Sequence, residues 1–101
     1  MVDKRSHARF TASIDVTLIY QDQRYQGRSR DVSLGGMFVY TDAPIPFGAT
    51  VYVEFLLPSL KSARCVEATM RWQQEGGIGV AWKSLRAQEV WALNQLFKHS
   101  A

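Results

Sequence analysis

The chain has 101 residues, of which 47% are hydrophobic and 21% are charged, and its formal net charge is +3. A chain of this length forms one domain, and its balance of apolar and charged residues excludes general disorder. Cys65 is the only cysteine, which excludes an intrachain disulfide and a thiolate metal cluster. The sequence contains no apolar stretch near the roughly 20 residues that cross a bilayer, and no signal-peptide pattern. We therefore expect a soluble, cytoplasmic protein without a membrane span.

Residues 1–10 are polar and show no hydrophobic period, so we expect a flexible N-terminal arm followed by one folded domain over residues 11–101. Positive charge gathers at this end of the chain. Half of the twelve Lys and Arg residues lie among the first thirty residues, namely Lys4, Arg5, Arg9, Arg24, Arg28 and Arg30. This distribution favours an anionic partner near the arm without naming it.

Alternating apolar and polar side chains predict several short strands. In chain order they are 11–20, 25–31, 37–40, 50–57, 64–73 and 78–82, of which 25–31 is predicted only as extended chain and 37–40 as a short apolar, partly β-favouring run. In the fifth stretch, Val66, Ala68, Met70 and Trp72 share one face and are expected to point inward. Pro44 and Pro46 exclude a central strand after residue 40, and Gly76-Gly77 predicts a hairpin. Short strands separated by turns are typical of an antiparallel barrel or sandwich.

The period changes near the C-terminus. Val90, Leu93 and Phe97 recur at helical spacing, and Ser84 is a candidate N-cap. We therefore predict one helix over about residues 84–98, whose apolar face packs on the barrel or on a partner.

Two short motifs carry the functional prediction: Arg5-Ser-His-Ala-Arg9 in the arm, and Asp31-Val-Ser-Leu-Gly-Gly36 beside a predicted strand. A guanidinium group binds phosphate as a bidentate fork and also matches guanine O6 and N7. A carboxylate can accept hydrogen bonds from guanine N1–H and N2–H₂, and a glycine lets the backbone approach a flat ring. Each motif alone has a simpler explanation, because exposed arginines are common and Asp, Ser and Gly are common in turns.

Together and in this order, the motifs resemble those of the PilZ domain, a bacterial receptor module for cyclic di-GMP. The segments Met70-Arg-Trp and Gly77-Ile-Gly-Val-Ala-Trp82 are similar to the closing hairpin of that family. The resemblance covers nearly the whole chain. It implies a mainly all-β fold, a six-stranded antiparallel β-barrel with one C-terminal α-helix, and an N-terminal arm that folds over the ligand.

The resemblance also implies roles for the motif residues. Arg5 and Arg9 would clamp guanine and phosphate, and Asp31 and Ser33 would hold a guanine from the barrel surface. Gly36 would shape the floor of the site.

Two further residues are weaker candidates for the cyclic di-GMP site. The alternation assigns Trp72 to the barrel interior, but the resemblance allows it to reach the ligand near the rim. Lys4 precedes the first arginine, at the position that in this family influences whether one or two ligand molecules bind. A lysine adds positive charge there without stacking as an arginine would, so the stoichiometry stays open.

The main functional hypothesis is a non-enzymatic cyclic di-GMP receptor. Its ligand would order the arm and change the surface offered to an effector protein of motility, polysaccharide synthesis, pilus assembly or chemotaxis. One alternative is a small barrel that binds single-stranded nucleic acid, with Tyr25, Phe38 and Tyr52 stacking on bases. Cations clustered at one end rather than along a groove disfavour it. The other alternative is a PilZ-like interaction module that binds no nucleotide.

Enzymatic activity is not expected. No catalytic set of Ser, His and Asp, no Cys–His pair, no phosphate loop and no metal constellation can be assembled from the sequence. The two histidines, His7 and His99, lie near opposite ends of the chain. We therefore expect neither a metal nor a cofactor other than the ligand itself.

Overall fold

The computed structural model describes residues 9–99, which form seven strands and one helix. The elements in chain order are β1 (Phe10–Thr11), β2 (Asp15–Tyr20), β3 (Gln23–Val32), β4 (Gly36–Tyr40), β5 (Thr50–Phe55), β6 (Arg64–Gln74), β7 (Gly77–Trp82) and α1 (Ala87–His99). Strands thus form most of the ordered structure, as the alternating pattern predicts.

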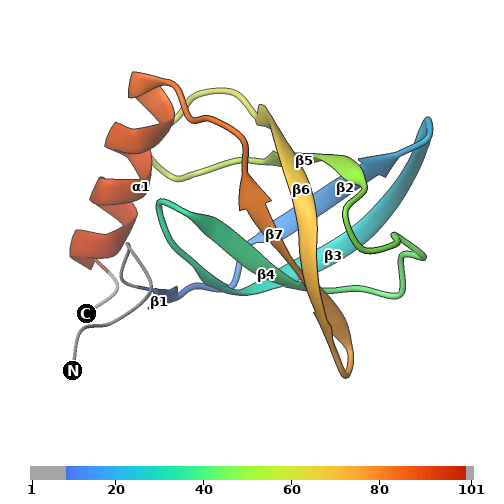
Figure 1. The fold of residues 1–101 in the computed structure, drawn as a ribbon. Helices are drawn as coiled ribbons and strands as arrows, with labels where there is room; N and C mark the ends of the chain where they lie inside the picture. The colour runs from blue at the N-terminus through green and yellow to red at the C-terminus, as the bar shows by residue number, and fades with distance from the viewer. Residues whose placement is uncertain (1–8, 100–101) are drawn as a thin grey trace.

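The strands form a closed antiparallel barrel. Their order is β1-β3-β2-β5-β6-β7-β4, and an additional pairing between β3 and β4 closes the sheet on itself. Six strands therefore make the barrel, and the two-residue β1 lies outside it as an extra strand on β3. Helix α1 packs beside this barrel, close to β1 and to the β3–β4 turn (Figure 1). The predicted six-stranded antiparallel barrel with a C-terminal helix is confirmed.

Apolar side chains from every second position of the strands fill the barrel interior and form the core. Val16, Leu18, Val51 and Val53 from β2 and β5 are each no more than 1% exposed. The same cluster includes the apolar face of α1, formed by Ala92, Leu93 and Phe97. The predicted apolar stripe of the helix therefore packs on the barrel of its own chain.

The stretch 11–20, predicted as one strand, is interrupted between β1 and β2. Here the buried hydroxyl of Ser29 takes the place of a ladder bond. It accepts a hydrogen bond from the backbone N–H of Ile14 at 2.9 Å and donates one to the carbonyl of Ala12. A serine side chain that satisfies backbone groups in this way competes with regular strand pairing.

Helix α1 begins at Ala87, three residues after the predicted N-cap Ser84. The Glu89 carboxylate accepts a hydrogen bond from the backbone N–H of Arg86 at 2.9 Å. This is the reciprocal half of a capping box, in which a glutamate in the first turn satisfies the amide of the N-cap residue. Arg86 is thus the N-cap position. No helix within residues 9–99 is long and apolar enough to cross a membrane.

Candidate functional site

A single row of paired residues crosses the outer face of the barrel on five strands. Thr11 of β1 pairs with Asp31 of β3, Asp31 pairs with Phe38 of β4, and Phe38 pairs with Gly79 of β7. Gly79 in turn pairs with Trp72 of β6. Residues paired across strands lie on the same face of a sheet. The row therefore places the Asp31 carboxylate and the Trp72 indole on one surface.

Trp72 lies on the outer face, so the prediction that it points into the barrel is wrong. The pairing register of β6 with β7 shifts between Met70 and Trp72, which makes Arg71 the extra residue of a β-bulge. A bulge reverses the inward and outward alternation beyond it. Met70 is therefore buried in the core, whereas the Trp72 ring covers Gly79, whose Cβ would stand 1.8 Å from Trp72 Cε2.

Arg9 joins this surface from the residue just before β1. Its Nε and Nη2 donate to Asp31 Oδ1 at 3.0 and 2.6 Å, and its guanidinium carbon lies 5.3 Å from the centroid of the Trp72 ring. The Arg9 and Asp31 side chains are only 21% and 14% exposed, so solvent screens their ion pair less than an open surface pair. The next residue, Phe10, stacks on Phe97 of α1 at 4.1 Å between ring centroids.

A second arginine on this face was not singled out by the motifs. Arg30 donates from Nε to Asp31 Oδ2 at 2.8 Å and from Nη1 to Gln74 Oε1 at 2.9 Å. Its guanidinium carbon lies 4.0 Å from the centroid of the Phe38 ring, which is completely buried. In the sequence Arg30 appears only as one of several clustered cations. The only sign that it belongs to the candidate site is its position directly before Asp31, the first residue of the second motif.

Ser33 and Gly36 lie in and beside the turn that joins β3 to β4. The Ser33 hydroxyl accepts hydrogen bonds from the backbone N–H groups of Gly35 and Gly36 at 3.0 and 3.2 Å, and Ser33 is 3% exposed. The indole N–H of Trp82 donates to the Ser33 carbonyl at 3.0 Å. A Cβ on Gly36 would stand 2.1 Å from the Val80 carbonyl oxygen, so only glycine allows this approach of β4 to β7.

The structure thus brings together Arg9, Asp31 and Trp72, and separately brings together Ser33 and Gly36 in the turn. Lys4, Arg5 and His7 lie outside the described residues. Ligand contacts of the predicted site residues stay predictions.

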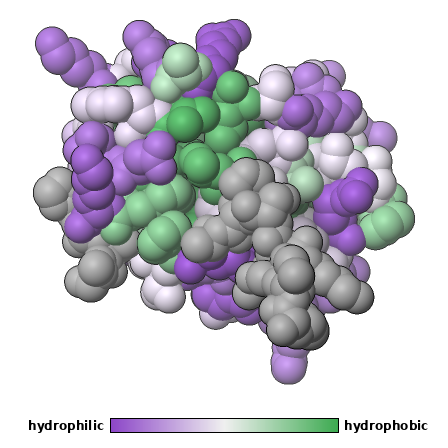
Figure 2. Space-filling view, turned by 60° about the vertical axis from the view of Figure 1, so that its left-hand side comes forward, coloured by the Kyte–Doolittle hydropathy of each residue, from purple (hydrophilic) through white to green (hydrophobic). Residues whose placement is uncertain are grey.

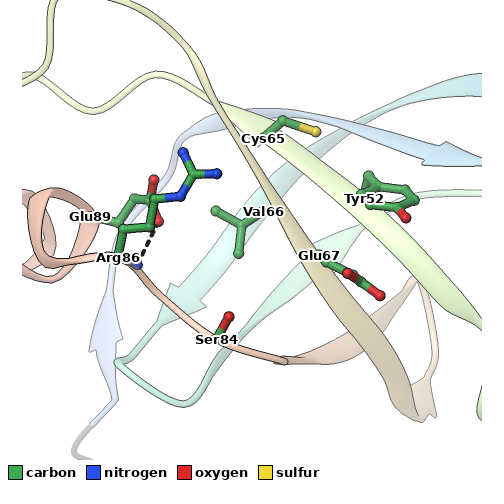
Figure 3. A pocket seen from close by; sticks show the side chains of 7 residues that line it. All are labelled: Tyr52, Cys65, Val66, Glu67, Ser84, Arg86 and Glu89. Atoms are coloured by element: carbon green, nitrogen blue, oxygen red, sulfur yellow. Dashed lines mark hydrogen bonds between the residues drawn. The ribbon is translucent and has the colours of Figure 1, made fainter.

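Another hollow lies between β5, β6 and the start of α1 (Figure 3). It has a volume of about 250 Å³ and includes Tyr52, Cys65, Glu67 and Glu89 in its lining. Burial and the neighbouring Glu54 raise the pKa of the Cys65 thiol, while Arg24 lowers it to a smaller extent. A raised pKa keeps the thiol protonated at neutral pH, so Cys65 is a poor nucleophile.

A groove of about 520 Å³ runs between the start of β2 and the end of α1, and its lining combines the apolar Ile14, Leu56 and Leu96 with the polar Ser13, Asp15 and Arg28. Figure 2 looks toward the α1 side of the molecule, where hydrophobic residues gather in one area among hydrophilic ones. Within residues 9–99 no group of three or more His, Cys, Asp or Glu side chains could hold a metal ion.

Comparisons with known proteins show the family and agree with the fold. The family model of the PilZ domain matches residues 3–99. The structure is similar to the PilZ domain of CeSA from a cellulose-synthesizing bacterium, with a TM-score of 0.69 and 21% identity over 90% of this chain and 95% of that one. It is also similar to the PilZ domain of YcgR from Escherichia coli, solved with c-di-GMP, with a TM-score of 0.74 and 13% identity over 97% and 92% of the two chains.

A third similar structure is the Bacillus subtilis inhibitor of motility, MotI/DgrA, with a TM-score of 0.72 and 16% identity. The alignment covers 99% of this chain and 55% of that protein. A comparison with characterised protein sequences found no significant match. The family match covers both sequence motifs and every strand of the barrel, and the chain therefore belongs to the PilZ domain family.

Proposed function

We propose that this PilZ domain is a receptor for cyclic di-GMP, without enzymatic activity. The observation that carries the proposal is the convergence of Arg9, Asp31 and Trp72 on one outer face of the barrel. A planar guanidinium, a carboxylate and an indole are the groups that bind a phosphate, the donor edge of a guanine and a flat ring, respectively. The similar PilZ domain of YcgR was solved with this ligand, which supports the choice.

The binding mode follows from where each group lies. Arg9 approaches from the residue before β1, whereas Asp31 and Trp72 are fixed on barrel strands. Arg5 belongs to the same sequence motif, and its part in binding stays an expectation from that motif. In the proposed mode the ligand draws the arm across this face and so changes the surface offered to a partner protein. The similar structures include a cellulose-related protein and an inhibitor of motility, so polysaccharide synthesis and motility are the first processes to test, ahead of pilus assembly and chemotaxis.

The nucleic-acid alternative loses one of its three stacking residues in the structure. Phe38 is completely buried beneath Arg30, whereas Tyr52 is 43% exposed. Single-stranded nucleic-acid binding needs several exposed aromatic rings along a basic groove. A titration with both cyclic di-GMP and an oligonucleotide separates the two functions. The same titration identifies a domain that binds no nucleotide.

Titration calorimetry with cyclic di-GMP, GMP and a short random oligonucleotide tests the proposal. We expect the wild-type protein to bind cyclic di-GMP and neither control, and the titration also returns the stoichiometry. Arg9→Ala should weaken binding by roughly 5- to 150-fold, because one bidentate arginine contact contributes about 1–3 kcal/mol. Wild-type protein that fails to bind cyclic di-GMP would contradict the proposal, and salt-sensitive oligonucleotide binding would favour the alternative.

Arg24→Ala is the matched control, because it also removes one arginine charge, at a position on β3 that is distant from the candidate site. Arg24 pairs with Glu54 and lies seven residues before Asp31, which corresponds to about 20 Å along a strand. We expect this variant to bind like the wild type. A loss of affinity as large as that of Arg9→Ala would assign the effect to net charge rather than to a contact.

A further inference from the structure

Arg30 and Asp31 are neighbours in the chain, yet both side chains lie on the outer face of the barrel. In a regular strand, neighbouring side chains point to opposite faces. Here the register of β3 with β4 shifts between Ser29 and Asp31, which makes Arg30 the extra residue of a bulge. The bond from Arg30 Nε to Asp31 Oδ2 at 2.8 Å shows that the bulge directs both side chains to one side.

The Arg30 guanidinium is held at three points. Beyond Asp31, it covers the buried Phe38 ring at 4.0 Å and donates to Gln74 of β6 at 2.9 Å. To reach β6 from β3 it crosses β4 and β7, where Gly77 lies so close to β4 that a Cβ there would stand 2.2 Å from the Val39 carbonyl oxygen and 2.9 Å from the Phe38 ring. A planar fork held by a carboxylate, an aromatic ring and an amide has one preferred orientation.

The Asp31 carboxylate now accepts three hydrogen bonds out of the roughly four that its two oxygens can accept. Both bonds from Arg9 go to Oδ1, and the bond from Arg30 goes to Oδ2. A guanine that donates N1–H to one oxygen and N2–H to the other needs one free position on each. Oδ2 has one, whereas Oδ1 has none until Arg9 releases at least one of its two bonds.

We propose that Arg30 is a positioning residue of the cyclic di-GMP site, an inference that rests on the function proposed above. It holds Asp31 Oδ2 before and after binding, so that the carboxylate meets the donor edge of the guanine. When the ligand binds, Arg9 gives up at least one of its hydrogen bonds to Asp31 Oδ1, and the guanine takes that position. Arg30 thereby determines how strongly the site selects guanine over a base that lacks the exocyclic amino group.

The test compares cyclic di-GMP with cyclic di-IMP, whose hypoxanthine bases lack that amino group. A hydrogen bond to a charged group corresponds to roughly 10- to 140-fold in affinity, so wild-type protein should prefer cyclic di-GMP by a factor in that range. In Arg30→Ala we expect weaker binding of cyclic di-GMP and a preference reduced to about threefold or less. The preference is a ratio of two affinities in the same variant, so a general loosening of the fold does not lower it.

Gln74→Ala is the second variant. It removes only the far anchor of the Arg30 fork, at an exposed position, and should reduce the preference by a smaller factor. Arg28→Ala is the matched control, because it removes an exposed arginine two residues away on β3 that pairs with Asp15. It should leave the preference unchanged.

Wild-type preference retained in both Arg30→Ala and Gln74→Ala would overturn the role of Arg30 and leave the receptor function standing. Wild-type protein that binds neither dinucleotide would overturn both proposals. Thermal unfolding without ligand identifies any variant that fails to fold, in which case the other variant decides.

Discussion

Gly79 illustrates at the residue scale how the candidate site depends on a missing side chain. A Cβ at this position would stand 1.8 to 2.3 Å from three atoms of the Trp72 ring, so the ring must move if one is added. We predict that Gly79→Ala lowers the free energy of unfolding by about 1–3 kcal/mol, as overpacking typically does. Urea denaturation measures this change, and near-UV circular dichroism should report the displaced indole.

The same substitution in a Trp72→Ala background isolates the cause. With the indole absent the added methyl group meets no ring, so the loss of stability caused by Gly79→Ala should largely disappear. An equal loss in both backgrounds would contradict the steric explanation and point to a backbone effect at Gly79.

Motif chemistry predicted from the sequence that Arg9 and Asp31 belong to one site, and the structure pairs them. It could not predict that Arg30 joins them or that Trp72 faces outward. Both features come from bulges, at Arg30 and Arg71, and one extra residue reverses the alternation on which the orientation of a strand residue is predicted. An arginine carries no sequence signal of a bulge, as a glycine or proline would.

At the scale of elements, Glu89 decides where α1 begins. Glu89 is 4% exposed, and its carboxylate accepts a hydrogen bond from the backbone N–H of Arg86. We predict that Glu89→Ala lowers the free energy of unfolding by about 0.5–2 kcal/mol, the usual range for the loss of a cap. Glu89→Gln should retain most of the stability, because glutamine serves the same position in a capping box.

Chemical denaturation of the two variants measures these differences. Glu75→Ala is the control, since Glu75 is exposed in the β6–β7 turn and its loss should change stability by less than about 0.5 kcal/mol. If Glu89→Gln were as unstable as Glu89→Ala, the cap would not be the reason for the loss.

The strands illustrate which boundaries a sequence pattern can predict. Alternation predicted the stretches of β5 to β7 closely, because every second residue of each is buried in the core, and a short apolar run predicted β4. It did not predict the break between β1 and β2, which depends on Ser29, a residue of another strand. A boundary set by a side chain distant in sequence leaves no local pattern.

At the scale of the whole molecule, the site draws on residues that lie far apart in the chain. Arg9 precedes β1, Asp31 lies on β3 and Trp72 lies on β6, so the closed barrel is needed to bring them together. Helix α1 takes part as well, because the Phe97 ring stacks on Phe10, the residue that follows Arg9. The last element of the fold therefore packs directly against the residue next to Arg9.

This coupling predicts that Phe97→Ala weakens cyclic di-GMP binding although Phe97 lies outside the site. The substitution should also lower the free energy of unfolding by about 3–5 kcal/mol, the range for a truncated core phenylalanine. Leu93→Ala is the matched control: Leu93 is buried on the same helix face and its truncation destabilises the fold by about 2–5 kcal/mol. Calorimetry at a temperature where both variants are folded should show reduced affinity for Phe97→Ala alone. Equal losses in the two variants would mean that binding follows overall stability, and the stacking of Phe10 on Phe97 would then have no specific role in positioning Arg9.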